Sequence, residues 1–261
     1  MQAALKVFIT GASSGIGQAL ARHYAAQGAT IGLAARRAGQ LQALAAALVA
    51  EFACATACYP LDVTDAGALR AAGEDFIARF GAPDIVIANA GVSVGTLTEC
   101  AEDLDAIRRV MDVNLFGMAA TFSPFVHAMR LAGRGRLVGI ASVAGIRGLP
   151  GAEAYSASKA AAISYLESLR LEMRGSGVRV VTICPGYIAT PMTEINPYRM
   201  PFLLAAPEAA RRFARAIERG TSYAVIPWPM GVVAKLLRLL PNAIYDRLFA
   251  KAPRKPRNLS L

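Results

Sequence analysis

The strongest constraint on the fold of this 261-residue chain is a repeated alternation between short apolar runs and longer helical patterns. Short apolar runs of this kind are typical of strands buried on both faces, as in a parallel sheet. They lie at residues 7–9, 30–34, 57–61, 85–88, 136–141 and 178–184. Helical patterns separate them at residues 16–27, 40–52, 66–80, 104–127 and 155–174. The order predicts an α/β fold with a doubly wound parallel sheet and right-handed crossovers.

The regularity fades after Pro185, although shorter elements are still indicated. We expect a helix at 207–218, a strand at 223–226, and two apolar helices at 230–240 and 243–249. No linker-like stretch divides the chain. The sequence therefore predicts a single domain with a short C-terminal helical extension.

The composition is that of a globular protein, with 55% hydrophobic and 18% charged residues. The formal net charge of +10 could attract nucleic acid, anionic lipid or a phosphate-bearing cofactor. The basic residues form no stripe except at 251–257, and no nucleic-acid-binding module is visible. We therefore expect no nucleic-acid partner.

The cysteines and the N-terminal segment bear on metal binding and location. Four cysteines occur without a CxxC pair, and there are only two histidines, so no metal site is expected. Unpaired buried thiols fit the cytoplasm. Residues 1–6 show no signal-peptide pattern, and no apolar run is long enough to span a membrane.

A glycine-rich turn follows the first predicted strand and opens the first predicted helix. Its spacing is G-x3-G-x-G, and it comprises Gly11, Ser13, Ser14, Gly15, Ile16 and Gly17. Glycine permits close backbone approach, and the free N–H groups of a helix N-terminus suit a pyrophosphate. A purely structural turn is the alternative. Its place in a doubly wound pattern favours dinucleotide binding.

The end of the second predicted strand bears on the choice of coenzyme. Ala35 stands where an NAD-binding fold needs an acid for the ribose 2′-hydroxyl, and Arg36 and Arg37 follow it. Guanidinium groups pair with phosphate in a forked geometry. The pattern predicts NADP(H), the alternative being two arginines that merely cap a surface loop.

Tyr155 and Lys159 lie four residues apart on a predicted helix, and therefore on one face. A cation about 4 Å away could lower the pKa of a tyrosine by up to about three units, which would make it a useful acid or base. A tyrosine and a lysine at this spacing are by themselves common on solvent-exposed helix surfaces, without a catalytic role. Ser142 at the end of the fifth strand, Asn114 and the segment 89–91 strengthen the catalytic interpretation.

Together these motifs resemble the short-chain dehydrogenase/reductase family. The resemblance covers residues 5 to about 193 and implies a Rossmann fold. It is carried by the glycine turn and by Asp62, Val63, Asn89, Ala90, Gly91, Asn114, Ser142, Tyr155, Lys159 and the segment Pro185 to Thr190. The implied cofactor and catalytic domain spans residues 1–225, and residues 226–261 belong to the same domain.

The resemblance implies roles for four catalytic residues. Tyr155 would be the acid/base, and Lys159 would lower its pKa and hold the nicotinamide ribose hydroxyls. Ser142 would orient the substrate oxygen, and Asn114 would support a water-linked proton relay to Lys159. Asn114 could instead hold a helix kink.

The resemblance also implies cofactor contacts beyond the glycine turn and the arginines. Asp62 would contact the adenine amine with Val63 beside it, and Asn89, Ala90 and Gly91 would line the cofactor ribose. Asn89 could instead brace the central sheet. The nicotinamide would be wrapped by Pro185, Gly186, Ile188 and Thr190.

The expected activity is NADP(H)-dependent transfer of hydride to or from a hydrophobic ketone, aldehyde or secondary alcohol. An apolar substrate pocket is indicated beside Ser142 by Val94, Val143, Ile146, Tyr187 and Met192. An NADP(H)-binding redox regulator without turnover is an alternative function. A regulator would not need Asn114, Ser142, Tyr155 and Lys159 together.

The C-terminal part departs from many family members, because it replaces their usual ending with apolar helices and basic residues. These helices could cover the substrate pocket or form a subunit contact in a homodimer or homotetramer. A basic amphipathic stretch could also lie on an anionic bilayer. Residues 230–257 would then make peripheral contact with the inner face of the membrane, as in membrane-associated reductases of lipids and steroids.

Overall fold

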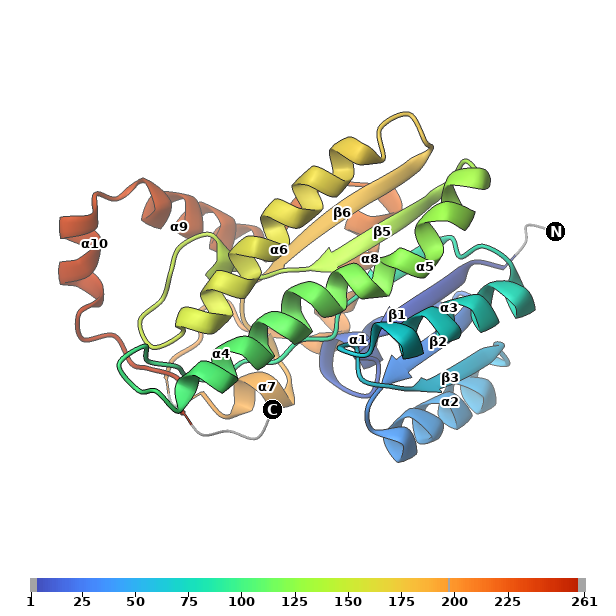
Figure 1. Ribbon diagram of the computed structural model, residues 1–261, viewed down its shortest axis with the longest axis horizontal. Helices are drawn as coiled ribbons and strands as arrows, with labels where there is room; N and C mark the ends of the chain where they lie inside the picture. The colour runs from blue at the N-terminus through green and yellow to red at the C-terminus, as the bar shows by residue number, and fades with distance from the viewer. Residues whose placement is uncertain (1–3, 197, 258–261) are drawn as a thin grey trace.

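A computed structural model describes residues 4–196 and 198–257. The predicted parallel sheet is confirmed: it has seven strands in the order β3-β2-β1-β4-β5-β6-β9, all parallel (Figure 1). The strands are β1 (Lys6–Thr10), β2 (Thr30–Ala35), β3 (Thr56–Pro60), β4 (Ile85–Ala88), β5 (Gly135–Ile140), β6 (Val178–Pro185) and β9 (Tyr223–Ile226). The winding direction reverses between β1 and β4, where open α/β sheets bind ligands at the carboxyl ends of their strands.

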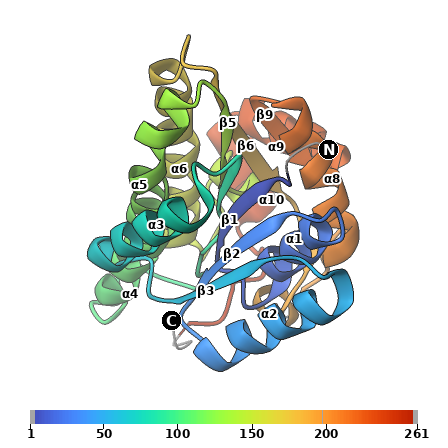
Figure 2. The ribbon, with the colours of Figure 1, turned by 90° about the vertical axis from the view of Figure 1, so that its right-hand side faces the viewer.

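Helices cover both faces of the sheet, as Figure 2 shows. One layer contains α1 (Gly15–Ala25), α2 (Ala38–Phe52) and α8 (Ala206–Arg219). The other contains α3 (Ala66–Phe80), α4 (Asp103–Met111), α5 (Gly117–Leu131) and α6 (Glu153–Glu172). The chain is thus one α/β domain of Rossmann-like type with C-terminal helices. The outer ends of the predicted ranges 1–225 and 226–261, residues 1–3 and 258–261, lie outside the described residues.

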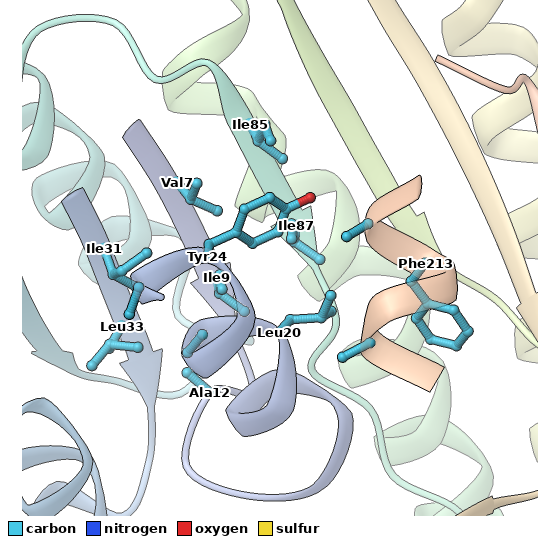
Figure 3. Close-up of a cluster of buried hydrophobic side chains, with 14 of the residues drawn as sticks. Val7, Ile9, Ala12, Leu20, Tyr24, Ile31, Leu33, Ile85, Ile87 and Phe213 are labelled. Carbon is cyan, nitrogen blue, oxygen red and sulfur yellow. The ribbon is translucent and has the colours of Figure 1, made fainter. Parts of the chain in front are cut away.

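The core explains why the apolar runs become strands. Figure 3 shows Ile9 and Leu33 on neighbouring strands facing Leu20 and Tyr24 of α1, with Phe213 of α8 at the side of this cluster. On the opposite face, other aromatic and aliphatic side chains of α3, α5 and α6 pack against the sheet. Since both faces are covered, β4 is buried throughout and β1 at every position after Lys6, so their sequences do not alternate.

The predicted helix at 104–127 is interrupted, which corrects the sequence prediction. A π-helical turn, Asp112–Phe116, joins α4 to α5. Gly117 lies directly after it, and a Cβ there would come within 2.7 Å of the Val63 side chain. Single π turns inside helices commonly occur at functional sites. Here the turn carries Asn114, which is fully buried.

The chain after β9 forms α9 (Trp228–Leu239) and α10 (Asn242–Phe249), which lie near the carboxyl ends of the strands in Figure 1. Met230 and Tyr245 are buried, and the Tyr245 hydroxyl donates a 2.6 Å hydrogen bond to the carbonyl oxygen of Gly148. The helices therefore cover a loop that follows β5. None of the helices among the described residues has the length and apolarity needed to cross a membrane.

Candidate active site

The glycine turn lies at the carboxyl end of β1, beside the end of β4. Gly11 has a φ of +66°, and a Cβ there would lie 2.8 Å from the Cα of Ala90. The Asn89 amide donates to the carbonyl oxygens of Thr10 and Gly11, at 3.1 and 3.2 Å. The turn is thus held against β4 without room for side chains, which leaves a cradle at the start of α1 that fits a pyrophosphate. Asn89 braces this cradle.

The two arginines after β2 lie beside the glycine turn. The Nη2 atom of Arg37 donates to the hydroxyls of Ser13 and Ser14, at 3.0 and 2.7 Å. Arg36 lies 4.0 Å from a carboxylate oxygen of Asp62, and its side chain is half exposed. Positive charge is therefore concentrated where the predicted 2′-phosphate would lie.

Asp62 follows β3 and is already paired within the protein. It accepts a 2.6 Å hydrogen bond from Arg109 and two from Thr64. Burial acts to raise the pKa of Asp62, but the hydrogen bonds from Thr64 and Arg109 outweigh it and hold that pKa below its usual value. Nothing in the sequence pattern indicated Arg109, which reaches this site from α4.

Ser142, Tyr155 and Lys159 lie together at the ends of β5 and α6. Ser142 follows β5 and is nearly buried, and its hydroxyl accepts from the backbone N–H of Ala144 at 3.1 Å. Tyr155 and Lys159 occupy successive turns of α6, with the Nζ atom 5.8 Å from the centroid of the phenol ring. Lys159 is 4% exposed and donates a 2.8 Å hydrogen bond to the carbonyl oxygen of Ile140.

The titration of this pair differs from the expectation that Lys159 lowers the pKa of Tyr155. In the structure, burial raises the pKa of Tyr155, although a hydrogen bond with Ser142 acts in the opposite direction. Burial also lowers the pKa of Lys159 to about 8. Desolvation is the largest cause of both shifts, and the Lys159 ammonium donates to the Ile140 carbonyl. Tyr155 is thus held as the neutral phenol at neutral pH.

Asn114 makes its amide contacts with the protein itself. Its Oδ1 atom accepts from the backbone N–H of Val92 at 2.8 Å. Its Nδ2 atom donates to the carbonyl oxygen of Val92 and to the hydroxyl of Ser158, at 3.0 and 2.9 Å. Ser158 in turn donates to the carbonyl oxygen of Tyr155. Asn114 therefore ties the loop after β4 to α6.

The segment from Pro185 to Thr190 closes the site from the end of β6. Gly186 lies against α9, since a Cβ there would come within 2.8 Å of Met230. Thr190 begins α7 (Pro191–Glu194), and its methyl group would lie 3.1 Å from a Cβ placed at Gly15. The segment predicted to wrap the nicotinamide therefore lies over the start of α1.

A single cleft joins these elements. The cleft is lined by every predicted cofactor residue except Gly17, and also by Ser142 and Met192. Gly17 lies against the Gly11 carbonyl, with which any side chain at that position would collide. Asn114 lies behind the wall. Lining residues that were not assigned a role from sequence include Leu61, Val92, Val113, Ile140, Ala141, Pro191 and Thr193.

Four residues predicted for the substrate pocket do not line the cleft: Val94, Val143, Tyr187 and Ile146, which ends the 3-10 turn after Ser142. Val94 is 2% exposed and packs in a separate small cluster with Val110 and Ala154. Tyr187 packs edge-on against Tyr198, and Val143 begins a short 3-10 turn after Ser142. The apolar character of these residues was visible in the sequence, but the direction in which each loop turns was not. Among the described residues, no group of His, Cys, Asp and Glu could hold a metal ion.

Comparison with known proteins agrees with this geometry. A family model described as short chain dehydrogenase matches residues 5–198. An uncharacterized oxidoreductase of Myxococcus xanthus is 40% identical over 91% of this chain and 93% of its own length.

Two solved structures also align over most of the chain. A short-chain dehydrogenase from Sphingobium yanoikuyae in complex with NADPH covers 92% of this chain and 97% of its own, with 26% identity and a TM-score of 0.77. A short chain dehydrogenase/reductase from Burkholderia phymatum in complex with NAD covers 99% and 98%, with 25% identity and a TM-score of 0.82. With the cleft described above, these matches show that the chain belongs to the short-chain dehydrogenase/reductase family of oxidoreductases.

Proposed function

We propose that this protein is an NADP(H)-dependent carbonyl reductase or alcohol dehydrogenase that acts on hydrophobic ketones, aldehydes or secondary alcohols. The observation that carries the proposal is the shared cleft: Ser142, Tyr155 and Lys159 line it together with the glycine turn. A proton donor and a dinucleotide cradle in one cleft are what hydride transfer to a carbonyl requires.

Ser142, Tyr155 and Lys159 each have a separate role in the proposed reaction. The nicotinamide coenzyme, when bound, supplies or accepts the hydride. Ser142 holds the substrate oxygen, and Tyr155 gives its phenolic proton to that oxygen as negative charge develops. One N–H of the Lys159 ammonium donates to the carbonyl oxygen of Ile140, which leaves two N–H groups for the ribose hydroxyls. Because burial raises the pKa of Tyr155, the resting phenol carries the proton that reduction consumes.

Arg36 and Arg37 support NADP(H) as the coenzyme. Ala35 offers no carboxylate to a ribose 2′-hydroxyl, and the Arg37 guanidinium lies across the start of the glycine turn. Asp62 is committed to Arg109 and repels a 2′-phosphate less than a free carboxylate would. Related structures hold either NADPH or NAD, so the coenzyme is to be measured on this chain.

The experiment that tests the function is an NADPH-oxidation screen over ketones and aldehydes graded by size and polarity. We expect turnover with apolar carbonyl compounds, a clear preference for NADPH over NADH, and loss of turnover in Tyr155→Phe. Absence of turnover in both directions, with NADPH binding intact, would refute the enzymatic proposal and favour a redox regulator.

One surface supports a second candidate, a reductase that works at a membrane surface. The outer face of α9 and α10 exposes Trp228, Leu236, Leu239 and Leu248 by 60–80%. Exposed Lys235, Arg238 and Arg247 lie among them. An apolar face bordered by cations suits an anionic bilayer. The tail contributes less than expected, because Lys255 and Arg257 are engaged within the protein.

Co-sedimentation with liposomes tests that candidate. We expect binding to vesicles that contain anionic lipid, reduced by salt and by the double variant Leu236→Ser/Leu239→Ser. A matched control is Leu131→Ser/Leu171→Ser, which removes two exposed leucines elsewhere on the surface. No salt-sensitive binding would remove the membrane candidate.

The proposal also covers the limits of the domain, the cellular location and the oligomeric state. Residues 1–225 form the catalytic part, residues 226–261 extend the same domain, and the protein works in the cytoplasm; contact with the inner face of the membrane belongs to the second candidate alone. A homodimer or homotetramer is supported by the exposed apolar residues of α9, where Leu236 and Leu239 are 60% and 80% exposed. Sedimentation velocity tests the assembly, and a monomer at micromolar concentration would contradict it.

A further inference from the structure

Residues 254–257, named here the C-terminal strap, lie across the loop that follows β4. The carbonyl oxygen of Pro256 accepts from the backbone N–H of Gly95 at 2.9 Å. The Lys255 ammonium donates to the Ser93 hydroxyl at 2.9 Å. Gly95 has no room for a side chain, because a Cβ there would collide with the Lys255 carbonyl. The strap and the loop are therefore in direct backbone contact.

An ion pair between Arg257 and Asp103 fixes the strap to the body of the protein. Two parallel hydrogen bonds join them, Nε to Oδ2 at 2.8 Å and Nη2 to Oδ1 at 3.2 Å. The Asp103 side chain is only 5% exposed and also accepts from the backbone N–H of Leu97 at 2.7 Å. Forked, partly buried pairs of this kind are stronger and more directional than exposed ones. One carboxylate thus joins the strap, the loop and α4.

The loop held by the strap connects the cleft to Tyr155. At one end, Val92 lines the cleft. Toward the other end, the Thr96 hydroxyl accepts from the backbone N–H of Ala154 at 3.2 Å, and Ala154 directly precedes Tyr155. The backbone N–H of Thr96 also donates to the carbonyl oxygen of Gly151. Displacement of residues 93–97 would consequently move both a cleft wall and the start of α6.

We infer that Arg257 is a positioning residue for the substrate side of the cleft. Its pair with Asp103 holds residues 93–97 in register with the start of α6, and so sets the space available to an apolar substrate beside Tyr155. The substrate part of this inference rests on the proposed carbonyl reduction. Among the described residues, no hydrogen bond joins the strap to the glycine turn or to the arginines after β2, so we expect coenzyme binding to change little when the strap is released.

The test compares three full-length variants. Arg257→Ala removes the forked pair, Arg257→Lys keeps the charge, and Lys251→Gln is a control that removes an exposed cation from the same tail. Amide hydrogen exchange is read at Gly95 and Leu97, whose acceptors lie on Pro256 and Asp103. We expect Arg257→Ala to lose about tenfold or more of the protection there, Arg257→Lys to recover part of it, and Lys251→Gln to match wild type.

Steady-state kinetics of the same variants is the second measurement. In Arg257→Ala, the KM for the best apolar ketone should rise about tenfold with kcat changed less than about threefold and the NADPH Kd unchanged. Unchanged protection at Gly95 and Leu97, or an unchanged KM, would overturn the inference. If wild type reduces no carbonyl compound, the proposed function fails. Hydrogen exchange still decides whether Arg257 holds the loop, and the substrate role is then withdrawn.

Discussion

The two sides of the cleft are built in different ways. On the coenzyme side, the glycine turn, Arg36, Asp62 and Asn89 each lie within a few residues of the end of a strand. On the other side, the loops behind the cleft are held by distant segments: the Gly148 carbonyl accepts from Tyr245, and Ser93 accepts from Lys255. Ser142 and Tyr155 lie where the two sides meet.

The difference concerns how rigidly each side is specified. Strand ends are fixed by the register of the sheet, so a glycine after β1 and an asparagine after β4 meet without further help. Loops hold their positions only through the side chains that tie them down, and loops vary more than the elements they connect. Substitutions should therefore separate the two sides: coenzyme binding should fail on one, and substrate recognition on the other.

The largest expected effect lies at the junction. Tyr155→Phe removes the proton donor but keeps the ring, so kcat should fall by about a thousandfold or more while the NADPH Kd changes little. Turnover and fluorescence titration of NADPH measure the two quantities. Activity within about tenfold of wild type would disprove the acid/base assignment.

The second largest effect is expected at Gly17, on the coenzyme side of the cleft alone. Gly17→Ala places a Cβ against the Gly11 carbonyl and within 2.6 Å of the Asn89 amide. We expect NADPH affinity to fall by about a hundredfold and the free energy of unfolding by about 2 kcal/mol, because the turn must move. Isothermal titration and chemical denaturation measure them. Gly39→Ala is the matched control: the space around Gly39 is open, and alanine there should be neutral or stabilising. Equal behaviour of the two variants would argue against the cradle.

The third prediction concerns Arg36 and Arg37 and the preference for NADPH over NADH. The double variant Arg36→Ala/Arg37→Ala should weaken NADPH binding by about ten- to a hundredfold, the cost of one or two charged phosphate contacts. The NADH Kd should change less than about threefold, because NADH lacks the 2′-phosphate. Arg70→Ala/Arg108→Ala removes the same charge from exposed sites and controls for long-range electrostatics. Equal weakening of both coenzymes would assign the arginines a structural role.

The smallest effect concerns the stability cost of Lys159. Because burial lowers the pKa of Lys159 to about 8, the folded state binds fewer protons than the unfolded state between about pH 8 and 10.5. The cost of burying the ammonium is therefore fully present below pH 8 and is relieved as the pH rises through that window.

Lys159→Met should accordingly be more stable than wild type by about 2 kcal/mol at pH 7, after allowance for the lost hydrogen bond to Ile140. The advantage should shrink toward pH 10. Denaturation midpoints of both proteins across this range measure it. A variant less stable than wild type at pH 7 would show that the bond to Ile140 outweighs desolvation.

The coenzyme side and the sheet were predictable from sequence because their signals are local. Short apolar runs such as 85–88, repeated between helical patterns, are typical of strands covered on both faces, and glycines after a strand mark a close backbone approach. The positions of Gly11, Arg37 and Asp62 follow from the ends of β1, β2 and β3. That Asp62 is paired with Arg109 did not follow, since the arginine comes from a helix far along the chain.

The substrate side was predictable only in part. Val94 has the apolar character of a pocket residue, but loop geometry places it in a small core with Val110 and Ala154. The basic tail suggested a membrane contact, yet Arg257 is held by a nearly buried carboxylate. The pKa of Tyr155 was assigned from charge proximity alone, whereas desolvation determines it. Each of these depends on tertiary contacts that spacing does not encode.

The strap has a consequence for the order in which the protein is made. Ribosomal synthesis delivers the glycine turn, Arg37, Asp62 and Asn89 first, whereas a domain generally folds as a unit. Ser93 meets Lys255 only after 162 further residues have been added. The wall beside Tyr155 therefore cannot be complete until the chain has reached Lys255 and Arg257. The newly made protein gains its fit to substrate last, with the arrival of Arg257.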